Sequence, residues 1–418
     1  MGGRRDQFAI YAVRRHLLDL GGDGMTTLAT FSSSQRIRQT VTATGRPGRT
    51  TVRTVYEPLI ASASDGGGDG HVVVGPGTAL SDPARDHLLR ALGVRSAVMA
   101  DAAAPSRTRE CPDAGEPAPV DVSAFLASAE RYGMEMRQVT VSRYESNRRY
   151  QAPGAAERVC AHTWSSLRAE PAAAYGSPIE IFWHAAICLD RVLDAARMLI
   201  AGPELPVMNG RGFRRARLTP DAMTVLLTSL TSAYVRRGAA EPPGGDARFV
   251  LRTCEADPGV PFGHCFDLDG VDTSVAVLSG PGRQVWPKPG ETPQPGVLGH
   301  RTTQRFAPVP VSRPGAVTLD GDHIDDGSVV AGYSGLVVTQ LAEHGASHLL
   351  EGSGFFLRAR GLVLDGGRPV GRWGPITMAL RGDEVIGRLL RVFSDGGFSR
   401  MNDLTVRRFW ADMEWGDQ

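Results

Sequence analysis

One short group of side chains in the sequence has the residue types for metal binding or acid–base chemistry: H-C-x-D-x-D, from His264 to Asp269. Imidazole, thiolate and carboxylate all bind zinc, and a cysteine beside a histidine could also pair a nucleophile with its base. Adjacent residues of an extended strand point to opposite faces, so His264 and Cys265 should not face one ion or act as one pair. We therefore predict no metal site here and expect substrate contacts from His264, Asp267, Asp269 and Arg305.

Other histidines and serines offer weaker patterns. His323 precedes two aspartates, and His344 and His348 have the spacing of a helical ligand pair but lie around a glycine in an expected loop. A Ser–His–Asp triad is defined by geometry, so the sequence leaves it open. The segment from Gly332 to Gly335 lacks the spacing of a G-x-S-x-G nucleophile elbow.

The stretch from Ala216 to Gly238 predicts a buried helix that these groups would be arranged around. Pro220 suits the first helical position, Thr219 before it is a plausible N-cap, and Asp221 complements the helix dipole. Apolar residues recur at three- and four-residue spacing. They are Ala222, Met223, Leu226, Leu227, Leu230 and Ala233.

This stretch, a strand end followed by x-L-T/S-P-x-A-x-x-x-L-L, resembles the metallopeptidase helix of the TldD/PmbA family. In TldD-like members the paired leucines precede H-E-x-x-x-H, whose histidines bind zinc with a cysteine near the C-terminus. The corresponding positions here are Thr228, Ser229 and Ala233, and no cysteine follows Cys265. Hydroxyl and methyl groups cannot replace these ligands. The helix therefore resembles the TldE or PmbA branch, which lacks the zinc motif.

Further segments resemble the family in the correct order between Ile179 and Phe393, about half of the chain. One is DPGVPFGHCFDLDGVDT, which is similar to a family segment written D-x-P-x-x-x-G-x-x-x-F-D-x-E-G-x-x-T. Its matching residues are Asp257, Pro258, Gly263, Phe266, Asp267, Gly270 and Thr273, with Asp269 in place of the glutamate. The glycine-rich strands from Gly352 to Phe393 resemble the family's terminal sheet.

The resemblance implies a non-catalytic subunit that pairs with a zinc-bearing TldD-like peptidase. Peptides or peptide-like metabolites would be the substrates, and antibiotic biosynthesis is one setting. Zinc would be bound only by the TldD-like partner, and this chain would bind no cofactor. The assembly would be a heterodimer with that partner or a homodimer of this chain. The alternative is a stand-alone, metal-independent enzyme of the same fold. A third hypothesis is a purely binding or carrier-protecting protein whose functional form is a homodimer.

The expected fold class is α+β. Residues 1–205 would form an N-terminal domain of helices and antiparallel sheet, and residues 206–418 a β-rich C-terminal domain of TldD/PmbA type. The elements expected are helices over Asp6–Leu20, Asp82–Leu92, Asp121–Tyr132 and Ile179–Ile200, and strands over Met134–Tyr144 and Phe249–Thr253. After the strand over Met134–Tyr144, a hairpin through Gln151–Gly154 is expected to lead into the extended segment ERVCAHTWSSLRAE, which contains Cys160.

Composition narrows the function classes. The 418 residues carry a net charge of +1, so there is no electrostatic case for a nucleic-acid or membrane partner. There is no transmembrane-length apolar run, and we expect no signal peptide. The five widely spaced cysteines include no C-x-x-C motif, which favours reduced thiols in a cytoplasm over a disulfide framework. They are Cys111, Cys160, Cys188, Cys254 and Cys265.

Overall fold

The computed structural model describes most of the chain, with gaps that include the expected helix over Asp82–Leu92. The described residues are 11–13, 26–43, 48–56, 59–64, 69–74, 97–98, 109–110, 116–151, 157–172, 178–200, 204–209, 212–237, 248–257, 259–266, 272–273, 275–279, 301–304, 307–312, 314–321, 328–343 and 354–415.

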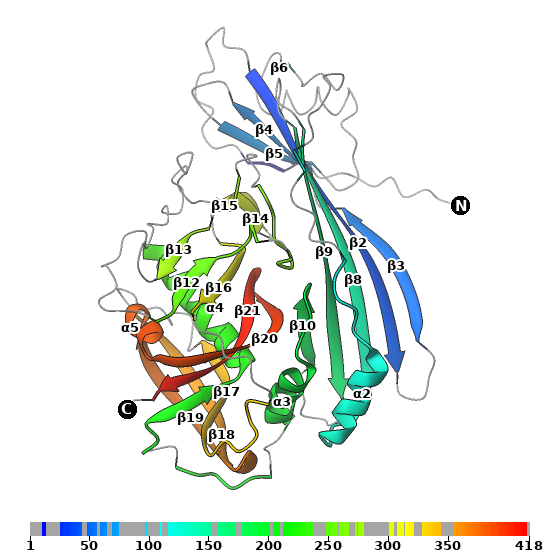
Figure 1. The fold of residues 1–418 in the computed structure, drawn as a ribbon. Coiled ribbons are helices and arrows are strands. Elements are labelled where there is room, and N and C mark those ends of the chain that lie inside the picture. The colour runs from blue at the N-terminus through cyan, green and yellow to red at the C-terminus, as the bar shows by residue number, and fades with distance from the viewer. Residues whose placement is uncertain are drawn as a thin grey trace.

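Long antiparallel strands form the N-terminal half (Figure 1). Their order is β3–β2–β8–β9, and the predicted hairpin into the Cys160 segment is confirmed as β8 and β9. The long strands are β2 (Thr26–Ala43), β3 (Arg49–Tyr56), β8 (Met136–Gln151) and β9 (Arg158–Pro171). Shorter strands are β1 (Tyr11–Val13), β4 (Leu59–Ser64), β5 (Asp69–Val74), β6 (Ala97–Val98) and β7 (Arg109–Glu110).

The helix expected over Asp6–Leu20 is wrong where the structure describes it. Tyr11–Val13 is strand β1, antiparallel to β5. Aromatic and β-branched residues such as Tyr11 and Val13 suit a strand once a partner is present, and a helical pattern cannot reveal that partner. The rest of that expected helix lies outside the described residues.

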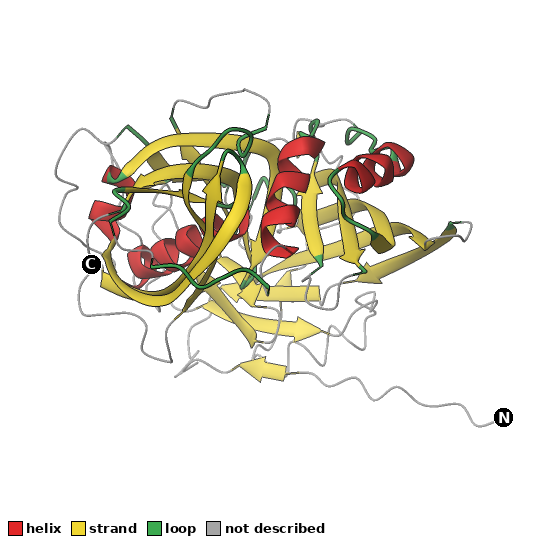
Figure 2. Cartoon of the chain, turned by 90° about the horizontal axis from the view of Figure 1, so that it is seen from below, coloured by secondary structure: helices red, strands yellow, loops and turns green. Residues whose placement is uncertain are grey.

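Two helices pack with this sheet through an apolar core. The helix α2 (Val122–Arg131) begins as predicted, because Asp121 accepts hydrogen bonds from the backbone N–H groups of Ser123 and Ala124 at 2.8 and 3.2 Å. The helix α3 (Leu189–Ile200) lies beside it (Figure 2). Phe125 of α2, Leu193 of α3 and Leu167 of β9 are fully buried in one cluster.

The expected helix over Ile179–Ile200 is correct only in its second part. Ile179–Trp183 forms strand β10, which pairs with β9 over five residues and with β20 (Leu389–Met401) through Phe182 and Phe398. Apolar residues so densely spaced fit a buried strand as well as a helix, and pairing on both edges decides the outcome. β10 therefore joins the strands of both halves in one mixed 19-stranded sheet.

The C-terminal half is rich in strands, as expected. β21 lies antiparallel to β20 and β11 and parallel to β16, while β17, β18 and β19 continue beyond β11. These strands are β11 (Arg215–Leu218), β12 (Val250–Thr253), β13 (Val277–Ser279), β16 (Ala316–Asp320), β17 (Gly335–Glu343), β18 (Gly354–Asp365), β19 (Arg368–Arg381), β20 (Leu389–Met401) and β21 (Leu404–Glu414). A separate hairpin consists of β14 (Arg301–Gln304) and β15 (Ala307–Ser312).

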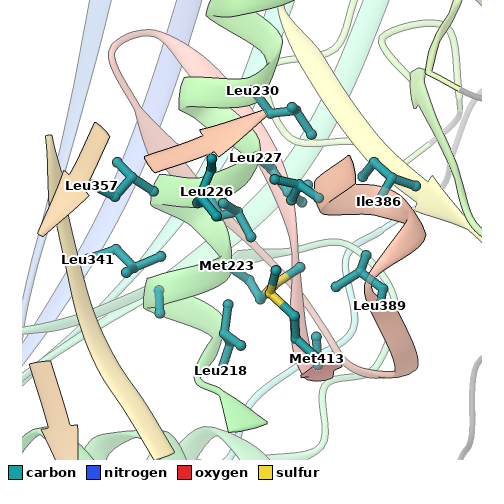
Figure 3. Close-up of a cluster of buried hydrophobic side chains, with 14 of the residues drawn as sticks. Leu218, Met223, Leu226, Leu227, Leu230, Leu341, Leu357, Ile386, Leu389 and Met413 are labelled. Atoms are coloured by element: carbon teal, nitrogen blue, oxygen red, sulfur yellow. The ribbon is translucent and has the colours of Figure 1, made fainter. Parts of the chain in front are cut away.

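The helix predicted after Thr219 is confirmed as α4 (Pro220–Arg237). It packs against β17, β18, β20 and β21 and against the short helix α5 (Gly382–Gly387). Figure 3 shows Leu226, Leu227 and Leu230 of α4 among Ile386, Leu389 and other apolar side chains. Among the described helices, none combines the length and the apolar character needed to cross a membrane.

Candidate functional site

The three positions of α4 that match the zinc motif lie in the protein core. Thr228, Ser229 and Ala233 are 2%, 0% and 3% exposed. Thr228 donates its hydroxyl hydrogen bond to the backbone oxygen of Thr224, one turn earlier, at 2.7 Å. None of these side chains offers an imidazole, thiolate or carboxylate to a metal. This part of α4 therefore packs in the core, with the Thr228 hydroxyl bonded to the helix backbone.

A buried charged network ties the start of α4 to the last two strands. Arg408 of β21 donates from Nε to Asp395 of β20 at 2.8 Å and from Nη1 to the Ser399 hydroxyl at 3.0 Å. A second carboxylate, that of Asp221 in α4, has its Oδ1 3.4 Å from Nη1 of Arg408. Burial alone lowers the pKa of Arg408, but the two carboxylates outweigh burial and raise it. Arg408 thus remains charged and serves to join three elements.

A second group of chemically capable side chains lies between β9 and the segment after β12. In the structure Cys160 and Cys265 form a disulfide, which differs from the reduced thiols that the sequence favours. His162 Nε2 lies 3.1 Å from Cys160 Sγ and 3.6 Å from Cys265 Sγ. Among the described residues these three form the one group of metal-ligand side chains whose donor atoms all lie within 4.8 Å of one another. We call this group the Cys160–His162–Cys265 cluster.

Strand alternation and aromatic packing position this cluster. Cys160 and His162 are two residues apart in β9, so they project from the same face. The segment that carries Cys265 is held against the sheet by Phe262, whose ring centroid lies 4.7 Å from that of Trp164 and 5.1 Å from that of Phe182. Phe262 has a positive φ of 62°, an uncommon conformation for a bulky residue. The packing over β9 and β10 holds it there.

Burial, with neighbouring charge as a smaller cause, favours a neutral imidazole at His162. Burial, with smaller contributions from Arg148 and His184, lowers the pKa of His162 to about 4. Arg148 is the cross-strand partner of Cys160 in the β8–β9 pairing. The two cysteine sulfurs can form a disulfide; when they are reduced, they and the neutral imidazole can act as a soft donor set for zinc.

His264 and Cys265 point to different neighbours, as their adjacency predicts. His264 is 4% exposed. A Cβ atom built on Gly315 would lie 3.2 Å from His264 Cε1 and 3.3 Å from Glu255 Cγ, so these two side chains meet at Gly315. The other expected substrate contacts, Asp267, Asp269 and Arg305, lie outside the described residues, as do His323, His344 and His348.

Ser334, the serine of the Gly332–Gly335 segment, stabilises a turn. Ser334 donates to Asp365 Oδ1 at 3.1 Å and accepts from the backbone N–H of Gly366 at 2.8 Å. These bonds fasten the start of β17 to the turn between β18 and β19, and no histidine takes part in them.

Sequence reasoning missed the Cys160–His162–Cys265 cluster because its two halves are 105 residues apart. The C-x-H spacing at Cys160 and His162, on a segment expected to be extended, was the available signal. It indicates that both side chains share one face.

No family model and no curated protein matches the sequence. Solved structures, in contrast, share its fold over nearly the whole chain. TldE from Thermococcus kodakarensis has a TM-score of 0.62 at 12% identity, covering 93% of this chain and 95% of its own. A proposed modulator of DNA gyrase from Thermotoga maritima gives 0.60 at 13% identity, covering 93% and 95%.

A second proposed gyrase modulator, from Bacteroides thetaiotaomicron, gives a TM-score of 0.55 at 12% identity and covers 94% of this chain and 96% of its own. Identities this low establish the fold and nothing finer. The sheet-rich chain therefore has a TldD/PmbA-like fold, shared with TldE along almost its full length.

Proposed function

We propose that this chain is a non-catalytic, TldE-like subunit that pairs with a zinc-bearing, TldD-like peptidase. One observation carries the proposal: on a fold shared with TldE, the α4 positions that match H-E-x-x-x-H hold Thr228, Ser229 and Ala233 in the core. A metallopeptidase needs ligands for zinc and a general base for the zinc-bound water. The partner would supply both, and this chain would complete the enclosure around a peptide or peptide-like metabolite.

The proposed setting is a cytoplasmic pathway that trims peptide-like compounds, such as an antibiotic precursor. The chain's near-neutral charge of +1 gives it no general attraction to nucleic acid or anionic membranes. We propose a heterodimer, with a homodimer as the alternative assembly. In the heterodimer the zinc at the α4 position would belong to the partner, which carries the intact motif, whereas a homodimer of this chain would have no zinc ligands at that position.

Co-expression with an intact H-E-x-x-x-H chain from the same genome tests the proposal. The two chains should co-purify, and the pair should cleave peptides in a reaction that chelator stops. Replacing the motif glutamate of the partner by glutamine should abolish cleavage without dissociating the pair. Peptide cleavage by this chain alone, with chelator present, would refute the accessory role.

The alternative is a stand-alone, metal-independent enzyme acting on a peptide-like metabolite. The observation in its favour is that two buried ionisable side chains, His264 and Glu255, are 4% and 1% exposed and both lie against Gly315. An imidazole and a carboxylate are the groups most often used in acid–base chemistry. Chelator-resistant turnover by the lone chain that disappears in His264→Gln, with the fold intact, would select this alternative.

A further inference from the structure

We propose that Cys160, His162 and Cys265, with both thiols reduced, bind one zinc ion. The site would join β9 to the segment after β12. It uses none of the α4 positions discussed above, so it goes beyond the proposed subunit role and can succeed or fail separately. In a cytoplasm that keeps thiols reduced, converging cysteines are more often metal-binding or catalytic than cross-linked.

The distances in the cluster suit a tetrahedral site. With Zn–S near 2.3 Å and Zn–N near 2.0 Å, tetrahedral angles place nitrogen and sulfur ligands about 3.6 Å apart. The two observed separations from His162 Nε2 are 3.1 Å to Cys160 Sγ and 3.6 Å to Cys265 Sγ. The Cα atoms of the two cysteines are 6.0 Å apart, so side-chain rotation can separate the sulfurs for a metal without moving the backbone.

Neighbouring groups favour thiolates at this place. The backbone N–H of Cys265 donates to Cys160 Sγ at 3.1 Å, a hydrogen bond that stabilises a thiolate. Arg148 lies across from Cys160 on β8, and cross-strand partners project from the same face of a sheet. Metal binding requires the thiolate form of both cysteines.

Burial indicates a site with one open coordination position. Cys160 and His162 are 1% and 7% exposed, whereas Cys265 is half-buried. Structural zinc sites have four protein ligands, while sites with three protein ligands keep the fourth position for water or a substrate atom. The cluster supplies three ligands, so we assign the fourth position to an exchangeable water.

Cobalt titration of the reduced full chain tests this proposal. The protein is treated with a phosphine reductant, separated from it without oxygen, and titrated with Co²⁺ alone. We expect thiolate-to-cobalt charge-transfer absorption that saturates at one equivalent, d–d bands typical of tetrahedral cobalt, and loss of both on addition of Zn²⁺. Absence of this spectrum in folded, fully reduced protein would overturn the proposal.

Matched cysteine variants locate the site. Cys265→Ser should remove about half of the charge-transfer intensity and weaken binding strongly. Cys188→Ser makes the same change at a half-buried free cysteine of the same chain and should leave the titration unchanged. Equal effects of the two variants would place the metal elsewhere. Circular dichroism and thermal unfolding of each variant establish that the fold is retained.

The histidine is tested separately. His162→Gln keeps both thiolates, so charge transfer should persist, while affinity should fall by more than the roughly 10- to 100-fold that loss of an outer-sphere partner costs. Unchanged affinity would exclude His162 as a ligand.

Thiol trapping in intact cells distinguishes the metal site from a permanent cross-link. Cells are quenched with an alkylating agent in denaturant, and the modified cysteines are identified by mass spectrometry. Alkylated Cys160 and Cys265 would support the proposal. A linked pair in cells, with no metal bound after reduction, would mean that the contact is only a disulfide. Neither result depends on peptidase activity, so failure here leaves the subunit role untouched.

Discussion

Arg408 and Asp395 form an ion pair in which both side chains are almost completely removed from solvent. Nε of Arg408 lies 2.8 Å from Oδ2 of Asp395, and the side chains are 2% and 0% exposed. Asp395 also accepts from the backbone N–H of Gly397 at 2.9 Å. The pair holds β20 against β21 close to the start of α4.

Removing one member of this pair should destabilise the protein severely. Asp395→Ala leaves a buried guanidinium with only the more distant Asp221, so we expect a loss of about 3–5 kcal/mol in the free energy of unfolding. Urea titration measures the loss. Glu384→Gln, which breaks an exposed ion pair with Arg388, is the control and should change stability by about 0.5 kcal/mol or less. Similar effects of both variants would contradict a structural role for Arg408.

The hydroxyls of α4 should be dispensable for any activity of the proposed complex. Thr228→Val removes the hydrogen bond to Thr224 without changing side-chain shape, at a cost of about 1 kcal/mol, and Ser229→Ala should cost a similar amount. The complex formed by the double variant should retain full peptidase activity, measured under conditions where the variant remains folded. Loss of turnover with intact assembly would show that these positions take part in the chemistry.

The carboxyl group of Asp194 should make stability depend on pH in an unusual direction. Burial raises the pKa of Asp194 above its ordinary value of 3.8, with the charge of Asp190 adding to the shift and the hydrogen bond from Ser328 opposing it. The folded chain therefore binds more protons than the unfolded chain just above that pH. This group's contribution to stability consequently falls as pH rises through the folded-state pKa.

The free energy of unfolding of Asp194→Asn, relative to that of the parent protein, should for that reason be higher at pH 7 than at pH 4. The amide oxygen can still accept from Ser328, whose hydroxyl lies 2.7 Å from the carboxylate, but the side chain cannot ionise. Urea unfolding across this pH range gives the difference curve. Glu130→Gln, which also removes one carboxylate but at an exposed site on α2, is the matched variant for comparison. A flat difference curve for Asp194→Asn would show that burial does not penalise its charge.

Gly361 is required by the close approach of β17 to β18. A Cβ atom at this position would lie 1.8 Å from the backbone oxygen of Val337 and 2.9 Å from Nε1 of Trp373. Gly361→Ala should therefore cost at least about 2 kcal/mol of stability. Gly387→Ala, where no neighbouring atom lies within 4 Å, is the control and should be close to neutral. Thermal unfolding of the two variants makes the comparison, and equal melting temperatures would rule out the steric conflict.

Local signals in the sequence predicted the elements that depend on short-range chemistry. Thr219 and Pro220 mark the start of α4, and Asp121 marks that of α2, because capping groups act within a few residues. The strand expected over Phe249–Thr253 was likewise predicted from its local residue pattern and is present as β12. The absence of imidazole, thiolate and carboxylate groups from Thr228, Ser229 and Ala233 was also readable, because it needs only residue types.

Features that depend on distant partners could not be read in this way. Ile179–Trp183 became a strand because β9 and β20 offer edges on both sides, and neither edge is visible in the local pattern. Cys160 and Cys265 meet only after the segment carrying Phe262 folds over β9. The buried partner of Arg408 likewise depends on the pairing of β20 with β21.

The position of β21 has a consequence for protein synthesis. β11, β16 and β20 pair with it and α4 packs against it, yet β11, α4 and β16 leave the ribosome well before it. Until residues 404–414 emerge, the apolar side chains of α4 lack much of their final covering. Such exposure favours aggregation of a nascent chain. We therefore expect this half of the fold to be completed only after residues 404–414 have left the ribosome.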